Sequence, residues 1–144
     1  MAEKLQHPEE NLEEQHAEAL AVASEAGHIL LENGAEISRV EETMERIASH
    51  YGVDSKSFFV LSNGIFTTSS FNKYANVEFI PFKGTQLDKV VAVNQLSRDI
   101  VAGKYDLDEA ATRLKEIRTM RLPQTTGTLS STVFCYICLQ ENAT

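Results

Sequence analysis

The chain has 144 residues, of which 42% are hydrophobic and 24% charged, so it can bury one core and has the usual size of a single domain. Its 13 basic and 21 acidic side chains give a formal charge of −8, and the basic residues do not cluster as phosphate contacts require. Nucleic acid is therefore excluded as an expected partner.

Cysteine and histidine spacing gives no sign of a metal or cofactor. The two cysteines, Cys135 and Cys138, lie together near the end of the sequence, so the body of the chain has no disulfide framework. A single C-x-x-C lacks the two further ligands of a zinc site. The four histidines show no metal-ligand spacing, and there is no phosphate loop or dinucleotide motif. We therefore expect neither a metal nor a cofactor.

Two helices are predicted at the start of the chain. An apolar repeat of three and four residues over residues 12–33 predicts a long helix, and the following Gly34 supplies a left-handed stop. A second repeat covers residues 37–51; Ser38 and Glu41 have capping-box spacing, although the helix could begin two residues earlier. The short connection predicts an antiparallel pair.

Three strands are predicted next. Residues 58–61 form a short apolar run, Asn63-Gly64 is a strong hairpin signal, and residues 65–69 are rich in β-branched side chains. A third strand is expected over residues 76–82, where Pro81 indicates an edge or terminal position.

Two more helices complete the pattern. Thr85 with Asp88 has capping-box spacing before a helix over residues 86–102, and Asp106 with Glu109 opens a fourth helix in the same way. The order α-α-β-β-β-α-α predicts an α+β fold, in which two N-terminal antiparallel helices and two C-terminal helices flank a small three-stranded sheet.

The predicted third helix is apolar on two opposite faces: Leu87, Val90, Val91 and Val101 on one, and Val93, Leu96 and Ile100 on the other. This pattern implies that both faces are covered. Asn94 and Arg98 project from the middle of the first face, so we expect both to lie largely inside the fold. Such residues either brace neighbouring elements or line a pocket for a polar or anionic ligand.

Charged residues also crowd the start of the second helix: Glu36, Ser38, Arg39 and Glu42. Exposed N–H groups at a helix start favour anions. Arg39 can pair locally with Glu42 or Glu36. If it instead faces Asn94 and Arg98 across the fold, the site could bind a small carboxylate ligand.

A hydrolytic alternative rests on His28, which lies four residues before Glu32 on the first predicted helix. With Ser38 these residues could form a Ser–His–carboxylate set. The sequence has no G-x-S-x-G elbow and no oxyanion-hole motif. We therefore assign no catalytic residue.

Four segments together resemble the threonine/serine exporter family: residues 26–44 (AGHILLENGAEISRVEETM), 62–67 (SNGIFT), 87–90 (LDKV) and 93–98 (VNQLSR). The resemblance covers about residues 17 to 120. It implies a cytoplasmic, non-enzymatic domain of an exporter in the cell membrane, whose transmembrane helices export threonine, serine or a dicarboxylate such as succinate. The implied partners are these helices or a small membrane-protein subunit. It also directs attention to five positions as a binding site: Glu36, Arg39, Glu42, Asn94 and Arg98.

The end of the sequence departs from this pattern. Residues 122–140 carry no charge, but only about half are apolar, and the apolar part is shorter than the roughly 20 residues of a spanning helix. We therefore expect a soluble domain over residues 1–121, and over residues 122–144 a truncated or frameshifted remnant of a first transmembrane helix that leaves the chain unable to transport alone. Besides the hydrolase, a free-standing protein-interaction module is the remaining alternative.

Overall fold

The computed structural model describes residues 8–54, 57–69 and 74–121. They form four helices and a three-stranded sheet in the predicted α-α-β-β-β-α-α order. The helices are α1 (Pro8–Glu32), α2 (Ile37–His50), α3 (Leu87–Val101) and α4 (Leu107–Thr119). The strands are β1 (Phe58–Leu61), β2 (Gly64–Ser69) and β3 (Tyr74–Phe79). The α+β class expected from the sequence is confirmed, while the expected remnant over residues 122–144 lies outside the described residues.

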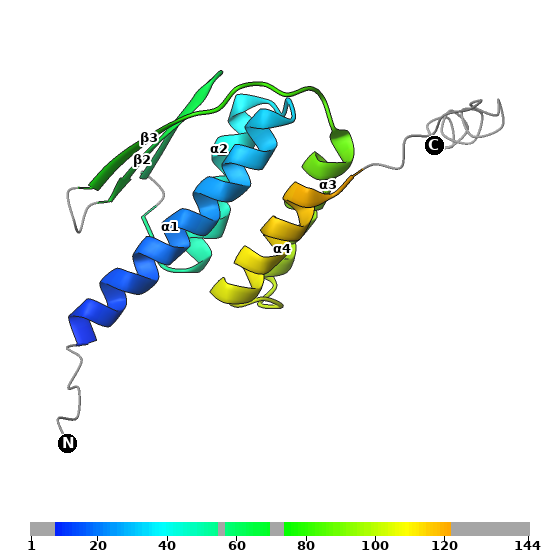
Figure 1. The fold of residues 1–144 in the computed structure, drawn as a ribbon. Helices are drawn as coiled ribbons and strands as arrows, with labels where there is room; N and C mark the ends of the chain where they lie inside the picture. Colours follow the sequence, from blue (N-terminus) through cyan, green and yellow to red (C-terminus); the bar gives the residue numbers. More distant parts are fainter. Residues whose placement is uncertain (1–7, 55–56, 70–73, 122–144) are drawn as a thin grey trace, which may run out of the picture.

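The elements form three layers (Figure 1). Helices α1 and α2 make the middle layer; the sheet covers one side of it, and α3 with α4 covers the other. Helix α1 contacts the three other helices and β2. Its buried face carries small side chains, including Ala19, Ala23, Ala26 and Gly27. Small residues let the neighbouring elements approach α1 closely, which explains why this helix can occupy the centre of the fold.

The sheet is an antiparallel meander in the order β1-β2-β3. Phe59 is opposite Phe66, and Phe66 is opposite Val77, so the hairpin at Asn63-Gly64 sets the register as the sequence predicts. Because side chains alternate along a strand, Val60 and Ile65 are buried against the helices, whereas Phe59 and Val77 lie on the exposed face. Strand β3 is at an edge, in agreement with the position of Pro81.

Capping differs between the helices. At α4, Asp106 accepts a hydrogen bond from the Glu109 backbone and the Glu109 side chain returns one, so the predicted capping box is present. Helix α2 begins after Glu36, which is the start two residues before Ser38 that the sequence left open, so no capping box forms at Ser38. The predicted box at Thr85 is wrong, because α3 begins after Gln86, which makes no side-chain cap bond. Gly34 has φ 82° and ends α1 in the left-handed conformation, as its position predicts.

The two apolar faces of α3 have different environments. Val93, Leu96 and Ile100 are buried against the other helices. On the other face Leu87, Val91 and Val101 are exposed while Val90 is half-buried against the core, so the expected cover on this side is present only at Val90. The sheet packs on the far side of α1 and α2 and does not cover α3 (Figure 1).

Candidate functional site

The predicted Asn94 position lies on a polar seam between α2 and α3. The Thr43 hydroxyl donates to Asn94 Oδ1 at 3.3 Å. One turn further along, Arg46 donates to Ser97 Oγ at 3.1 Å, and Ser97 Oγ donates to the Asn94 carbonyl oxygen at 2.8 Å. Asn94 is only half-buried, so the expectation that it lies largely inside is met in part. Within the described chain it braces α3 against α2.

Arg98 is exposed, and the expectation that it is buried is wrong. It projects from the uncovered face of α3, next to the exposed Val101. Its side chain makes no hydrogen bond or ion pair in the part of the chain that the structure describes. An exposed guanidinium is solvated by water and needs no buried carboxylate partner, so the physical reason for a pocket around Arg98 disappears.

Of the other predicted residues, Glu36 and Arg39 lie toward the opposite end of the α2–α3 seam, and Glu42 lies beside its middle. Arg39 is 70% exposed and pairs with Glu42 at 3.5 Å, while Glu42 also accepts from Arg46 at 2.6 Å. Glu36 is exposed at the start of α2. Of the two local pairings considered for Arg39, the structure therefore has the one with Glu42. An exposed pair of this kind stabilises the fold by at most about 1 kcal/mol.

The seam also fixes how far Arg39 lies from Arg98. Thr43 contacts Asn94, Arg39 is one turn before Thr43, and Arg98 is one turn after Asn94. At a rise of about 1.5 Å per residue, their backbones are separated by about 12 Å along parallel helices. The two guanidinium groups therefore start from opposite ends of the seam. A role in ligand binding for the five predicted residues stays a prediction.

The most extensive polar cluster surrounds His28, on the other side of α1. Its Nδ1 lies 2.6 Å from Glu78 Oε1 on β3, and its Nε2 lies 3.1 Å from Glu32 Oε2 one turn along the helix. The guanidinium of Arg118 from α4 lies 3.3 Å from the same Nε2. The predicted His28–Glu32 contact is present, and the cluster joins α1 to both β3 and α4.

Glu32 is the most buried carboxylate of this cluster, with 11% of its side chain exposed. Burial raises the pKa of Glu32, but the hydrogen bond and charge of Lys83, with the charges of His28 and Arg118, outweigh burial and hold its pKa below the ordinary value. Lys83 Nζ lies 2.5 Å from Glu32 Oε1, and the Lys83 backbone N–H donates to the Glu32 carbonyl. Glu32 therefore fixes the segment between β3 and α3.

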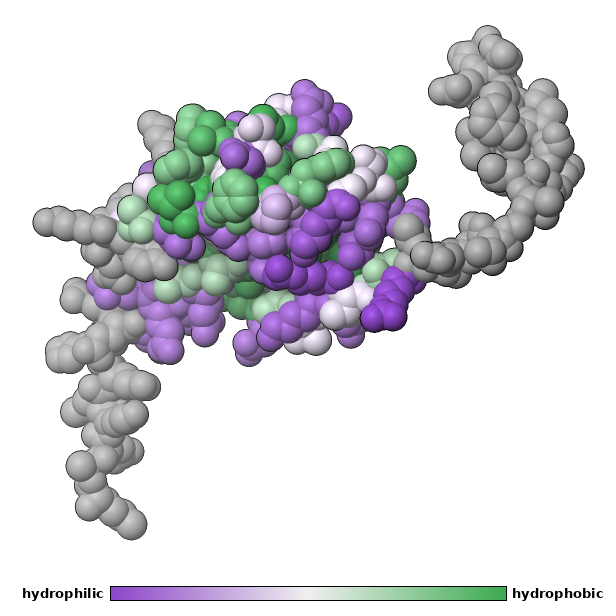
Figure 2. Space-filling model, turned by 45° about the horizontal axis from the view of Figure 1, so that its top comes forward, coloured by the Kyte–Doolittle hydropathy of each residue, from purple (hydrophilic) through white to green (hydrophobic). Residues whose placement is uncertain are grey.

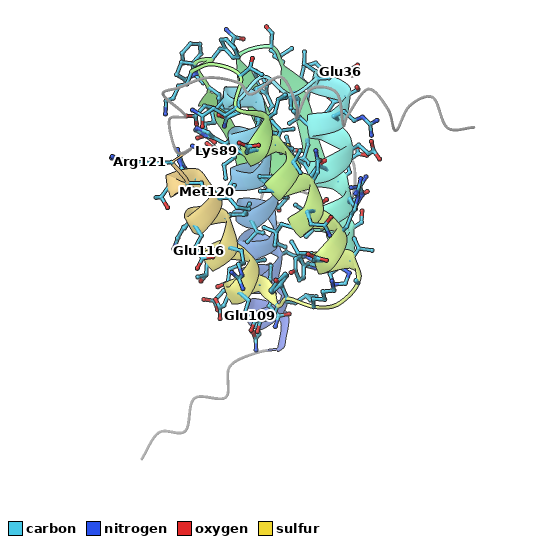
Figure 3. The ribbon with its side chains drawn as sticks, turned by 90° about the vertical axis from the view of Figure 1, so that its right-hand side faces the viewer. Glu36, Lys89, Glu109, Glu116, Met120 and Arg121 are labelled. Atoms are coloured by element: carbon cyan, nitrogen blue, oxygen red, sulfur yellow. The ribbon has the colours of Figure 1, made fainter. Side chains whose placement is uncertain are left out.

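Two further contacts tie α4 into this region. Arg118 donates to Glu25 Oε1 at 2.5 Å, and Lys89 Nζ donates to the Arg118 carbonyl at 2.9 Å. The second contact places the start of α3 beside the end of α4. Figure 3 shows Lys89, Met120 and Arg121 on the same side of this end of the molecule.

His28 is not available to Ser38 as a general base. Its two ring nitrogens face Glu78 and the Glu32–Arg118 pair, and within the described residues no hydrogen bond joins it to Ser38. A nucleophile and its base must lie within hydrogen-bond reach. The arrangement instead resembles a structural ion-pair network.

Ser38 and Glu36 line an open hollow of about 530 Å³ beside the α1–α2 turn, together with residues of three segments: Leu31, Gly34, Ala35, Ile37, Ser62 and Phe82. The hollow lies next to the start of α2, where backbone N–H groups point outward. It contains one of the five predicted binding residues, Glu36, whose carboxylate would repel an anion. Among the described residues no group of three potential metal ligands is present.

Sequence reasoning missed four residues that organise these clusters: Arg46, Glu78, Lys83 and Arg118. Lys83 lies 51 positions from its partner Glu32, and Glu78 lies 50 positions from its partner His28, so no helical spacing indicates either contact. Arg46 could have been found, because it lies four residues after Glu42 on the same helix. Only the packing of α3 on α2 brings Ser97 to it.

Comparisons with known proteins agree with the resemblance. The family model ThrE, described as "Putative threonine/serine exporter", matches residues 21–139. The match runs past residue 120, where the resemblance seen in the sequence ended, and includes most of the uncharged stretch. No curated protein and no solved structure is significantly similar to the chain. No helix in the described ranges has both the length and the apolar character for crossing a membrane. Because the matched region includes more than half of the chain, the protein belongs to the threonine/serine exporter family.

Proposed function

We propose that the described fold is the cytoplasmic domain of an exporter of small polar metabolites: threonine and serine, or a dicarboxylate such as succinate. The observation that carries the proposal is the family match over residues 21–139, which takes in nearly the whole fold from the middle of α1 onward. Transport itself is assigned to membrane helices, either of the same transporter or of a small membrane-protein partner subunit.

In this proposal the domain binds the solute or couples to the membrane helices, and it does not catalyse a reaction. The polar side chains that the fold brings together are paired with one another, as in the His28–Glu32–Glu78 contacts and the Arg46–Ser97 contact. Catalytic groups need an activated nucleophile within reach of a base. The engagement of both His28 nitrogens argues against the hydrolase reading, so the transport role is the better supported one.

A small carboxylate ligand remains part of the proposal in a modified form. Arg39 and Arg98 are exposed at opposite ends of the α2–α3 seam, so a threonine or succinate molecule would contact one of them at an open surface. Open sites without enclosing walls bind weakly, because solvent competes for every charged contact. Weak binding suits a step that must release its ligand.

The test is solute efflux from cells. The gene is deleted, cells are loaded with labelled threonine, serine or succinate, and efflux is followed with and without the restored gene. Efflux of at least one solute should fall on deletion and return with the wild-type gene. Unchanged efflux of all three solutes would refute the exporter role.

A second arm separates binding from catalysis. The purified chain is titrated calorimetrically with the same three solutes, and ester hydrolysis is measured alongside. His28→Ala should leave solute binding intact, and the matched variants Arg39→Met and Arg98→Met identify which guanidinium the ligand uses. Ester cleavage that disappears in His28→Ala would favour a hydrolase instead.

A further inference from the structure

Large apolar side chains are exposed from the last residue of β3, through the connection, to the first residue of α3, residues 79–87. Phe79 is 70% exposed, Phe82 64% and Leu87 67%. Isolated exposed apolar residues are common, but three within nine residues concentrate apolar surface in one segment of the chain. Figure 2 shows apolar side chains gathered on the upper part of the molecule, over the sheet and this connection. The connection therefore presents a protruding apolar edge to its surroundings.

The backbone of this connection is firmly held. Ile80 is buried, and its N–H donates to the Asn63 carbonyl. Lys83 is fixed to Glu32 through both its backbone and its ammonium group. A Cβ on Gly34 would come within 3.1 Å of the Phe82 ring, so the α1–α2 turn lies directly beneath that ring. The apolar side chains are thus held outward by a fixed backbone, and little ordering entropy remains to be lost on binding.

Basic residues lie beside this apolar edge, together with one exposed carboxylate, Asp88, in the first turn of α3. Lys83 and Lys89 belong to the connection and to the first turn of α3, and Lys89 contacts the end of α4. Arg121 follows that end and is exposed (Figure 3). Glu36 lies at the same end of the molecule but across it, at the start of α2 (Figure 3). Aromatic side chains with neighbouring Lys and Arg are the combination found at membrane interfaces.

The opposite end of the molecule is acidic. Glu109 lies there, far from Arg121 and Lys89 (Figure 3). The first turn of α4 has exposed Asp108 and Glu109 after the Asp106 cap, and the N-terminal half of α1 adds exposed Glu13 and Glu14. A chain of net charge −8 is repelled by an anionic surface unless it presents its basic end. The distribution of charge therefore selects one orientation.

The sequence that follows α4 is also relevant to a contact with a membrane interface. Residues 122–140 follow Arg121 directly and contain no charged side chain. The uncharged stretch therefore follows the end of α4, where Lys89, Met120 and Arg121 lie on one side of the molecule (Figure 3).

We propose that residues 79–87 contact an anionic lipid bilayer, with Phe79, Phe82 and Leu87 at the interface and Lys89 and Arg121 near lipid phosphates. The proposal rests on the exporter role, which requires the domain to work beside a membrane. Beyond that role, residues 79–87 are the surface that meets the bilayer, and the charge distribution sets the orientation of the domain. The acidic ends of α1 and α4 then face away from the bilayer.

Vesicle binding of the full chain tests the proposal. Sedimentation with vesicles of equal parts phosphatidylcholine and phosphatidylglycerol is compared with phosphatidylcholine alone. The wild type should bind the anionic vesicles, and less so as salt is raised. Phe82→Ser and Leu87→Ser should each weaken binding about tenfold, because each removes a large apolar side chain from the interface. Lys89→Gln should weaken it about fivefold.

Matched controls change the same residue types elsewhere. Val101→Ser alters the last turn of α3, whereas Leu87→Ser alters the first. Lys115→Gln removes an exposed lysine from the outer surface of α4. Both controls should bind as the wild type does. Every variant keeps residues 122–144, so any binding by that segment is the same throughout.

Several results would overturn the proposal: no vesicle binding by the wild type, equal binding by Phe82→Ser and the wild type, or equal losses in variants and controls. A wild-type dimer that Phe82→Ser makes monomeric, without a lipid effect, would assign the surface to a second copy of the chain. Solute efflux that depends on the gene, combined with any of these results, would leave the exporter role standing. Vesicle binding without gene-dependent efflux would refute the exporter role and leave the membrane contact standing.

Discussion

His28 Nδ1 lies 2.6 Å from Glu78 Oε1, which joins the middle of the fold to the edge strand of the sheet. The other nitrogen of His28 faces Glu32 and Arg118, so one imidazole connects α1, β3 and α4. Half-buried networks of this kind hold elements in a defined arrangement when every member has a partner. Four predictions follow from this network and from the packing around α1 and α2.

Replacing Glu32 by glutamine should lower the free energy of unfolding by about 1–3 kcal/mol at neutral pH, because a half-buried set of charge-assisted hydrogen bonds is lost. Although burial raises the pKa of Glu32, Lys83, His28 and Arg118 hold it below 4.5. This stabilisation is therefore complete above 4.5 and is lost as pH falls through the folded-state pKa.

Urea unfolding across the acidic range measures both effects. The wild type should lose more stability on acidification than Glu32→Gln does. The matched control is Glu116→Gln, which removes a carboxylate from an exposed pair with Arg113. It should change stability by less than about 1 kcal/mol. Parallel acid curves for the wild type and Glu32→Gln would contradict the role given to Glu32.

Gly27→Ala should destabilise the fold, because an added Cβ would overlap the sulfur of Met44 on α2. Overpacking at a buried helix contact costs about 1–3 kcal/mol. A shorter side chain at position 44 gives the methyl group room, so Gly27→Ala should cost less in a Met44→Val background. A double-mutant cycle by chemical denaturation measures this coupling. Equal costs in the two backgrounds would show that Gly27 and Met44 do not meet.

The two arginines near the α2–α3 seam should behave differently. Arg46→Met removes hydrogen bonds to Ser97 and Glu42 and should lower stability by about 1–2 kcal/mol. Arg98→Met removes an exposed side chain and should change stability by less than about 0.5 kcal/mol. Thermal and urea unfolding of the pair provide the measurement, each variant serving as the other's control. A loss in Arg98→Met as large as in Arg46→Met would mean that Arg98 is packed inside.

Tyr51 should contribute to the alkaline limit of stability. Its burial, together with the charges of Asp106 and Glu109, raises its pKa above 10.0, and its hydroxyl donates to the Tyr105 carbonyl at 3.1 Å. The neutral form is favoured in the fold, so this stabilisation is complete below 10.0 and lost as pH rises through the folded-state pKa.

Tyr51→Phe should therefore cost about 1 kcal/mol at neutral pH and flatten the alkaline loss of stability. Tyr105→Phe is the matched control, because it keeps the carbonyl that accepts from Tyr51 and should retain the alkaline loss. Unfolding midpoints measured up to strongly alkaline pH compare the three proteins. An unchanged alkaline limb in Tyr51→Phe would assign that loss to other groups.

The sequence alone determined the features that depend on nearby residues. The left-handed stop at Gly34, the hairpin at Asn63-Gly64 and the capping box at Asp106 all follow from backbone preferences within a few positions. The His28–Glu32 contact also follows from helical spacing. These features gave the order of elements and the α+β class. The run of residues 26–44 gave the family, because its order and spacing are visible without a fold.

Only the tertiary structure decided which faces are covered and which distant charges meet. The apolar pattern of α3 has two faces, and periodicity cannot show that the one with Val93 is buried while Val91 and Arg98 remain exposed. That outcome depends on the sheet packing against the far side of α1 and α2. The partners of Glu32 were hidden for the same reason, since Lys83 reaches it only when the β3–α3 connection crosses the end of α1. Long-range packing is a property of the whole chain, and local spacing does not encode it.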